Sequence, residues 1–90
     1  MAAIRFPLGQ TVITQGALAA LNKHDVVTAI QRHSSCDWGD VCPEDRTAND
    51  AALRDGTRLF SVYTSSDGTR FWVITEADRS VTTFLLPSEY

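Results

Sequence analysis

The sequence predicts an α+β domain in which two or three N-terminal helices pack on a C-terminal three- to four-stranded antiparallel β-meander. Two observations lead to this class. Residues 15–55 carry apolar side chains at helical spacing between residues typical of helix ends. Residues 57–86 instead alternate between turns and short β-branched or aromatic runs. With 90 residues, 43% of them hydrophobic and 21% charged, we expect a single domain over residues 1–90.

The first two helices are expected after short polar segments. Thr14 is a suitable N-cap for a helix over residues 16–21, because its hydroxyl can accept a hydrogen bond from a free backbone N–H of the first turn. Asp25 is a suitable N-cap for a second helix over residues 26–33.

A third helix is expected to begin near Pro43, since proline is favoured in a first helical turn. Glu44 and Asp45 follow at positions where the helix dipole favours negative charge. Gly56 predicts the end of this helix, because glycine adopts the left-handed conformation of many helix C-caps.

Four short runs predict the strands, the first of them as an edge strand or an extended lead-in. The runs are residues 11–13, 59–63, 71–74 and 81–86. Asp67-Gly68 lies between the second and third runs and is a strong hairpin signal. A longer turn over residues 76–79 precedes the last run, and Pro87 ends it.

Charge and hydropathy exclude several classes of protein. The net charge of −3 and the isoelectric point of about 5.1 disfavour direct binding of nucleic acid. No apolar run approaches the ~18 residues that a membrane span needs. The first residues, MAAIRFPLGQ, lack the apolar core of a secretory signal, so we expect a cytoplasmic protein.

Acidic residues concentrate between positions 37 and 55, where the net charge is −4, whereas the rest of the chain sums to +1. The acidic residues are Asp37, Asp40, Glu44, Asp45, Asp50 and Asp55. One interpretation is a solvated helix face, and the other is a surface that meets a basic groove on a partner. Trp38 lies within this region, either as a lid over the core or as an exposed interface anchor.

A metal site is a weaker interpretation. The candidate ligands are His24, His33, Cys36, Asp37 and Cys42, but the spacings between histidine and cysteine match no standard zinc motif. We therefore expect no metal and no cofactor. We also expect the two cysteines to stay unpaired in a reducing compartment, although a disulfide between them remains an alternative.

Catalytic interpretations are similarly weak, so we expect a protein that is not an enzyme. His33 is only three residues from Cys36, unlike the long-range pairings usual in cysteine hydrolases. Asp37 and Asp40 with Arg46 could form a small metal-dependent nuclease, although aspartates more often form turns and caps.

The apolar run over residues 71–74 lacks polar alternation, which predicts that both faces of this strand are covered. Helices would cover one face. Trp72 would then lie in the core or at the edge of a contact surface, and a second subunit is one candidate cover, so a homodimer remains open.

Several stretches together resemble a family of small proteins carried on bacterial plasmids and other mobile elements, labelled "plasmid-related". These stretches are residues 5–10, 14–18, 37–40, 74–83 and 86–90. The resemblance spans nearly the whole chain, and residues 74–83 with 86–90 are its most specific part. Cys36 and Cys42 depart from the family pattern, which argues further against cysteine chemistry.

The resemblance implies a role in the restricted set of tasks that mobile elements encode. The leading expectation is a non-enzymatic inhibitor, of anti-CRISPR or anti-restriction type, that binds a CRISPR effector or restriction enzyme stoichiometrically. The expected partner-binding residues are Asp37, Trp38, Asp40, Glu44, Asp45, Asp50 and Asp55. The alternative is an antitoxin or plasmid-maintenance protein that binds a small protein partner through an exposed sheet face.

Overall fold

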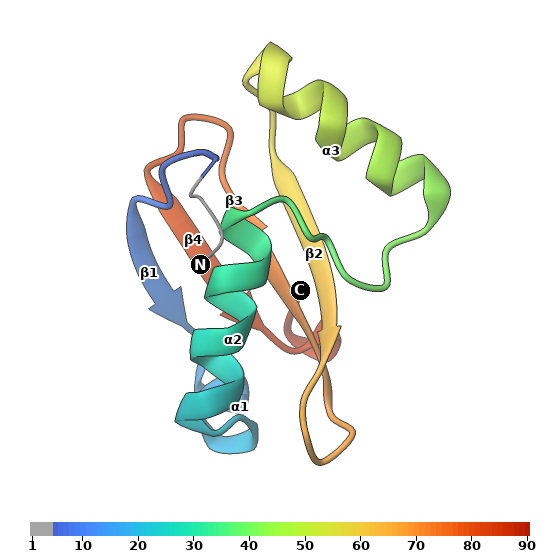
Figure 1. The fold of residues 1–90 in the computed structure, drawn as a ribbon. Coiled ribbons are helices and arrows are strands. Elements are labelled where there is room, and N and C mark those ends of the chain that lie inside the picture. Colours follow the sequence, from blue (N-terminus) through green and yellow to red (C-terminus); the bar gives the residue numbers. More distant parts are fainter. Residues whose placement is uncertain (1–4) are drawn as a thin grey trace.

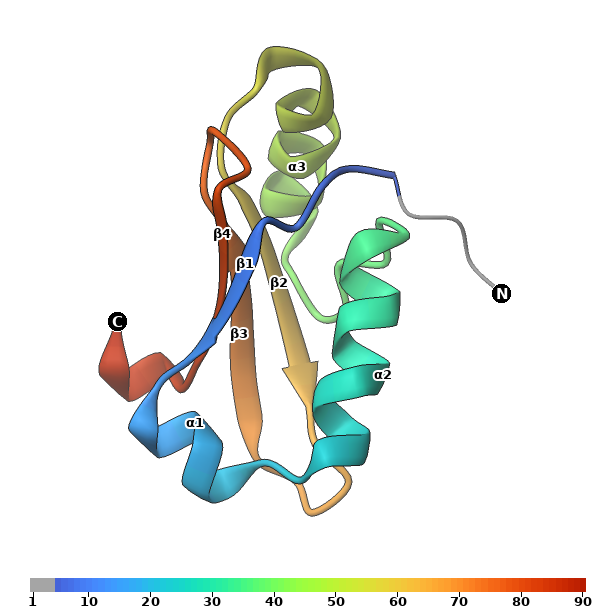
Figure 2. The same cartoon turned by 90° about the vertical axis from the view of Figure 1, so that its left-hand side faces the viewer.

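The computed structural model describes residues 5–90, which form one sheet with helices around it (Figure 1). The elements in chain order are β1 (Gln10–Ile13), α1 (Gln15–Ala20), α2 (Lys23–Ser34), α3 (Pro43–Asp55), β2 (Leu59–Thr64), β3 (Arg70–Thr75), β4 (Val81–Leu85) and the 3-10 helix η1 (Pro87–Glu89). Seen along the sheet, α2 covers one face, whereas η1 lies on the other side (Figure 2). Within residues 5–90, no helix is both long and apolar enough to cross a membrane.

The sheet is mixed, so the predicted antiparallel β-meander is wrong as a description of the whole sheet. The strand order is β1-β4-β3-β2. Strands β2, β3 and β4 pair antiparallel, but β1 pairs parallel to β4, with Gln10 opposite Val81 and Ile13 opposite Phe84. The helices precede β2, β3 and β4, whereas β1 precedes the helices and covers the run that the sequence predicts as an edge strand or an extended lead-in.

The physical reason for this difference is the distance along the chain between the paired strands. Adjacent strands joined by a tight turn must run antiparallel, and turn residues reveal such pairs locally. The β1–β4 pair instead joins the two ends of the chain across all three helices. A short polar strand such as β1 carries no local signal of its partner or direction.

The helix starts follow capping chemistry, with one correction. Thr14 caps α1 as predicted, and its hydroxyl accepts from the Ala17 N–H at 3.3 Å. Asp25 does not cap α2, which begins earlier, because the Asn22 side chain accepts from the Asp25 N–H at 2.8 Å. The Asp25 carboxylate accepts instead from the hydroxyl of Ser66, at 3.0 Å, and so joins α2 to the β2–β3 turn.

Helix α3 begins at Pro43 and ends at Asp55, with Gly56 as its C-cap, as the sequence predicts. Gly56 has φ of 70°, the left-handed conformation of a helix C-cap. Arg79, in the β3–β4 turn, holds this end of the helix. Its guanidinium donates to the carbonyl oxygens of Ala52, at 3.0 Å, and Thr57, at 2.6 Å.

Two groups of buried side chains form the core. The first lies between the sheet and helices α1 and α2, and contains Ala17, Leu21, Ala29, Tyr63, Phe71, Val73 and Phe84. The second lies where α3 and the α2–α3 loop meet β2, and contains Phe6, Trp38, Val41, Ala52, Leu59 and Val62. The helices therefore bury one face of the sheet and one edge of it, and leave the opposite face less covered.

The outer edge of β2 is closed by irregular structure rather than by another strand. Val62 donates to the Trp38 carbonyl at 3.0 Å, and Asp40 donates to the Val62 carbonyl at 2.8 Å. Further along, the Asn49 amide of α3 donates to the Phe60 carbonyl at 2.7 Å and accepts from the Phe60 N–H at 3.0 Å. This edge is thereby protected from pairing with another chain.

Candidate protein-binding surface

The predicted acidic residues are exposed except for Asp45, which is half-buried. Two of them pair with arginines on neighbouring elements. The Asp37 carboxylate lies 2.8 Å from the Arg32 guanidinium, and Asp40 lies 3.4 Å from Arg70. The hydrogen bond from Arg32 lowers the pKa of Asp37. These two carboxylates therefore serve local structure at the surface as well as adding charge.

The acidic residues of α3 point in different directions. At 3.6 residues per turn, Asp50 is one turn from Arg46 and one turn from Arg54, so cations flank it on both sides. Asp50 also accepts a hydrogen bond from the Trp38 indole at 3.3 Å. Glu44 and Asp55 lie at opposite ends of the helix. The six predicted residues are thus spread over the α2–α3 loop and several sides of α3.

Trp38 is a lid over the core. It is 2% exposed and stacks on Phe6 with ring centroids 6.1 Å apart, while His33 meets it edge to face at 5.6 Å. The alternative of an exposed interface anchor is wrong for the folded chain, because the ring presents no free surface. Its part in the site is to hold the α2–α3 loop against β2.

A buried hydrogen-bond chain runs beneath α2. His33 is fully buried, with Nδ1 2.6 Å from the Ser61 hydroxyl and Nε2 2.9 Å from the Thr75 hydroxyl. Thr75 lies 2.7 Å from Thr82, which donates to the Leu8 carbonyl at 2.7 Å. Because a carbonyl only accepts, Thr82 must accept from Thr75, so Nε2 carries the proton and Nδ1 accepts from Ser61.

Ser61 and His33 of this hydrogen-bond chain do not form a catalytic pair. Both are completely buried, so no substrate can reach the Ser61 hydroxyl. Burial, with a smaller contribution from the charge of Arg79, lowers the pKa of His33 to about 4. A neutral imidazole with both nitrogens bonded is a structural element that joins α2 to the sheet.

The candidate ligands of a metal site are not brought together. His33 points into the core, and the cysteines are both free, with Cys42 exposed and Cys36 half-buried. Burial raises the pKa of the Cys36 thiol, which disfavours the reactive thiolate. Within the part of the chain that the structure describes, no group of three histidine, cysteine or acidic side chains is placed to hold a metal ion.

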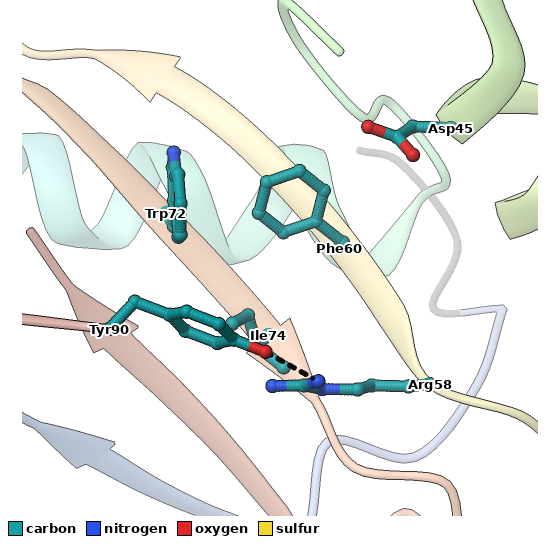
Figure 3. Close-up of a pocket in the computed structure, with 6 residues that line it drawn as sticks. All are labelled: Asp45, Arg58, Phe60, Trp72, Ile74 and Tyr90. Carbon is teal, nitrogen blue, oxygen red and sulfur yellow. Dashed lines mark hydrogen bonds between the residues drawn. The ribbon is translucent and has the colours of Figure 1, made fainter. Parts of the chain in front are cut away.

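A concavity lies on the sheet face opposite α2. It has a volume of about 320 Å³ and is lined by Asp45, Arg58, Phe60, Trp72, Ile74 and Tyr90. We call this the aromatic pocket. Three rings surround its centre, with the Arg58 guanidinium on one side and the Asp45 carboxylate on the other (Figure 3). Its volume lies at the lower end of the range of about 300–1,000 Å³ usual for ligand sites.

The rings of the aromatic pocket contact one another in sequence. Phe60 and Trp72 come from neighbouring strands and meet edge to face, with centroids 5.1 Å apart. Tyr90 packs against Trp72 in the same way at 5.5 Å. The Arg58 guanidinium donates to the Tyr90 hydroxyl at 2.9 Å and lies 5.3 Å from the centroid of its ring. Tyr90 is nevertheless 69% exposed, so the pocket is open to solvent.

The sequence singles out only some of the residues that line the aromatic pocket. Asp45 and Trp72 are among the residues that the sequence singled out, the latter as a residue of a contact surface. Arg58, Phe60 and Tyr90 were not identified as site residues. Phe60 alternates with residues of the buried face of β2, a pattern that could have placed it opposite α2. No local pattern places Tyr90 there.

Comparison of the chain with protein-family models, with curated proteins and with solved structures gives no match.

Proposed function

We propose that this chain is a non-enzymatic protein-binding module that acts stoichiometrically from the cytoplasm, with the aromatic pocket as its principal contact surface. The observation that supports this proposal is a partly exposed cluster of Trp72, Tyr90 and Phe60 beside Arg58 on the less covered sheet face. Tryptophan, tyrosine and arginine are the residues that most often dominate the binding energy of protein interfaces.

The partner class that we propose is a host nucleic-acid-targeting complex, such as a CRISPR effector or a restriction enzyme. The support is the resemblance to plasmid-borne proteins together with the acidic character of the chain. Such complexes present basic surfaces to nucleic acid. Exposed carboxylates on α3, such as Glu44 and Asp55, would steer the chain toward a basic surface and raise the association rate at low salt.

The test is affinity capture from a host lysate at low salt with three tagged forms of the chain. The forms are the natural sequence, Trp72→Ala, and Leu18→Ala as the control. Leu18 is an exposed apolar residue of α1, 65% exposed, outside the pocket. We expect the natural chain and Leu18→Ala to recover the same complex and Trp72→Ala to lose it. Equal recovery by all three forms would overturn the assignment of the pocket.

The identity and salt dependence of the captured partner separate this proposal from its alternative. Recovery of a restriction or CRISPR complex that is released as salt rises supports the inhibitor. Recovery of one small protein regardless of salt supports an antitoxin or maintenance protein, because the apolar rings of Phe60 and Trp72 would then supply most of the affinity. Self-association that Trp72→Ala abolishes would identify a homodimer instead.

A further inference from the structure

We propose that the aromatic pocket receives an arginine side chain of the partner protein. This inference rests on the proposed function, since it names the chemistry by which the binding module recognises its partner. Three features of the pocket lead to it: the arrangement of its rings, the balance of charge at its rim, and the guanidinium that it already holds.

The rings provide faces that attract a cation. Trp72 meets Phe60 and Tyr90 at interplanar angles of 84° and 65°, so neighbouring rings are strongly inclined to one another rather than stacked. Inclined rings around a common centre present both negative faces and positive edges to it (Figure 3). Tryptophan is the strongest of the aromatic residues in binding a cation on its face.

The charged groups at the pocket favour a cation over an anion. The positive charge of the Arg58 guanidinium is balanced by the carboxylate of Glu76, which lies 3.8 Å away. On the opposite side, the half-buried Asp45 points its carboxylate from α3 toward the rings (Figure 3). Among residues 5–90, no cation lies within ion-pair distance of Asp45. With Glu76 counted beside the lining residues, the charges of Arg58, Glu76 and Asp45 sum to −1, so Asp45 can accept a hydrogen bond from an incoming cation.

The pocket already holds one guanidinium in the manner that we propose for the partner. Arg58 packs over the ring of Tyr90 and donates to its hydroxyl. A guanidinium suits such a site better than an ammonium, because it is planar, stacks on rings and donates two parallel hydrogen bonds to a carboxylate. An arginine from the partner would pack against Trp72 and Phe60 and donate to Asp45.

The test uses N-acetyl-arginine amide as the probe and the indole N–H signals of the two tryptophans as the readout. Trp72 lines the pocket, while Trp38 is buried and bonded to Asp50, so the signal of Trp38 serves as an internal reference. We expect saturable shifts of the Trp72 signal with a dissociation constant of about 1 mM, and none at Trp38. N-acetyl-leucine amide and N-acetyl-glutamate amide should bind about tenfold more weakly.

Two variants that each remove one negative charge complete the experiment. Asp45→Asn should weaken the binding of the arginine probe about tenfold. Asp67→Asn removes the same charge from the β2–β3 turn, outside the pocket, and should leave binding unchanged, because Asn-Gly suits the same turn. Equal weakening by both variants, equal binding of the three probes, or no binding of the arginine probe would overturn the inference.

The outcomes of the two sets of experiments are distinguishable. If Trp72→Ala abolishes capture of the partner but the arginine probe fails to bind, the binding module stands and the arginine inference falls. If the arginine probe binds through Asp45 but Trp72→Ala retains the partner, the pocket recognises a guanidinium and the proposed interface is wrong.

Discussion

The Glu89 carboxylate, near the C-terminal end of the chain, accepts a hydrogen bond of 2.5 Å from the hydroxyl of Thr14, the N-cap of α1. It also accepts from the backbone N–H of Gly16 at 3.0 Å and of Leu86 at 2.9 Å. One side chain thus closes η1 and caps α1. Because Tyr90 is the next residue, this contact fixes the ring that lies against Trp72.

If the proposed function holds, Glu89→Ala should weaken partner binding although Glu89 does not itself line the aromatic pocket. Loss of the carboxylate frees the last turn, so Tyr90 no longer packs against Trp72. Partner affinity and the indole N–H signal of Trp72 should change together, whereas Ser88→Ala should change neither. A variant that loses affinity with an unaltered Trp72 environment would contradict this positioning role.

The same contact has a predictable pH dependence. The hydrogen bonds to Glu89, first of all from Thr14, lower its pKa below the ordinary value of 4.5. A depressed carboxyl pKa stabilises the folded chain above pH 4.5, and this contribution is lost as the pH falls through the lower pKa of the folded state. Acid should therefore release the C-terminal turn, an effect visible as a change in the indole N–H signal of Trp72 that is absent in Glu89→Ala.

His33 predicts a separate loss of stability in weak acid. Its pKa is about 4 in the folded chain and 6.5 in the unfolded chain. Between these values the unfolded chain binds more protons, so the free energy of unfolding rises with pH. We expect a fall of about 3 kcal/mol between pH 7 and pH 4, since each pH unit is worth about 1.36 kcal/mol.

Urea unfolding as a function of pH measures this fall, and NMR measures the titration. For the NMR measurement the exposed His24 is replaced by glutamine (His24→Gln), so that the remaining imidazole signal belongs to His33. An imidazole that titrates near pH 6.5 in the folded chain would contradict the prediction. The carboxylates with lowered pKa values begin to lose their own contribution only as the pH falls below about 5, so the fall between pH 7 and pH 5 reports His33.

The hydrogen-bond chain beyond His33 should be costly to interrupt. Thr75→Val keeps the shape of the side chain but leaves the Nε2–H of His33 without an acceptor in the core. Loss of one partner of a buried polar group costs about 1–3 kcal/mol. Thr83→Val, on the adjacent strand but the opposite face, is the control and should be near neutral. Equal stabilities of the two variants would show that this series of hydrogen bonds contributes nothing to the free energy of unfolding.

Local chemistry made much of this fold predictable. Thr14, Pro43 and Gly56 mark helix ends through their own conformational preferences, and Asp67-Gly68 marks a hairpin. The capping of α2 was less predictable, because Asn22 and Asp25 are both good caps and only tertiary contacts of Asp25 decide between them. The pairing of β1 with β4 and the packing of Tyr90 on Trp72 join distant parts of the chain, and no local signal encodes them.

The candidate site could likewise be predicted only in part, because local patterns identify residues but not their tertiary contacts. Counting charges identified Asp45 but could not separate it from Asp37, Asp40 and Asp50, whose partners appear only in the fold. Trp38 and Trp72 were similarly ambiguous, because an apolar ring is equally suited to a core and to an interface. The structure separates them by placing one under the α2–α3 loop and the other on the open sheet face.

Gly39 is a position at which a single added methyl group should strongly destabilise the fold. It has φ of 74°, in the left-handed region that disfavours side chains, and a Cβ built there would lie 2.0 Å from the Val62 carbonyl oxygen. That oxygen accepts the hydrogen bond from Asp40 that closes the edge of β2. Gly39→Ala must therefore displace the loop from the strand.

We expect Gly39→Ala to lower the free energy of unfolding by more than about 2 kcal/mol, from backbone strain and the lost edge contacts together. Gly68→Ala is the matched control, because its φ of 91° is also left-handed but nothing lies within 4 Å of the added Cβ. It should therefore cost only the backbone strain. Urea unfolding of both variants measures the difference, and amide exchange of Val62 and Asp40 should accelerate in Gly39→Ala alone. If the two variants were equally stable, conformational strain rather than closure of the β2 edge would explain the glycine at position 39.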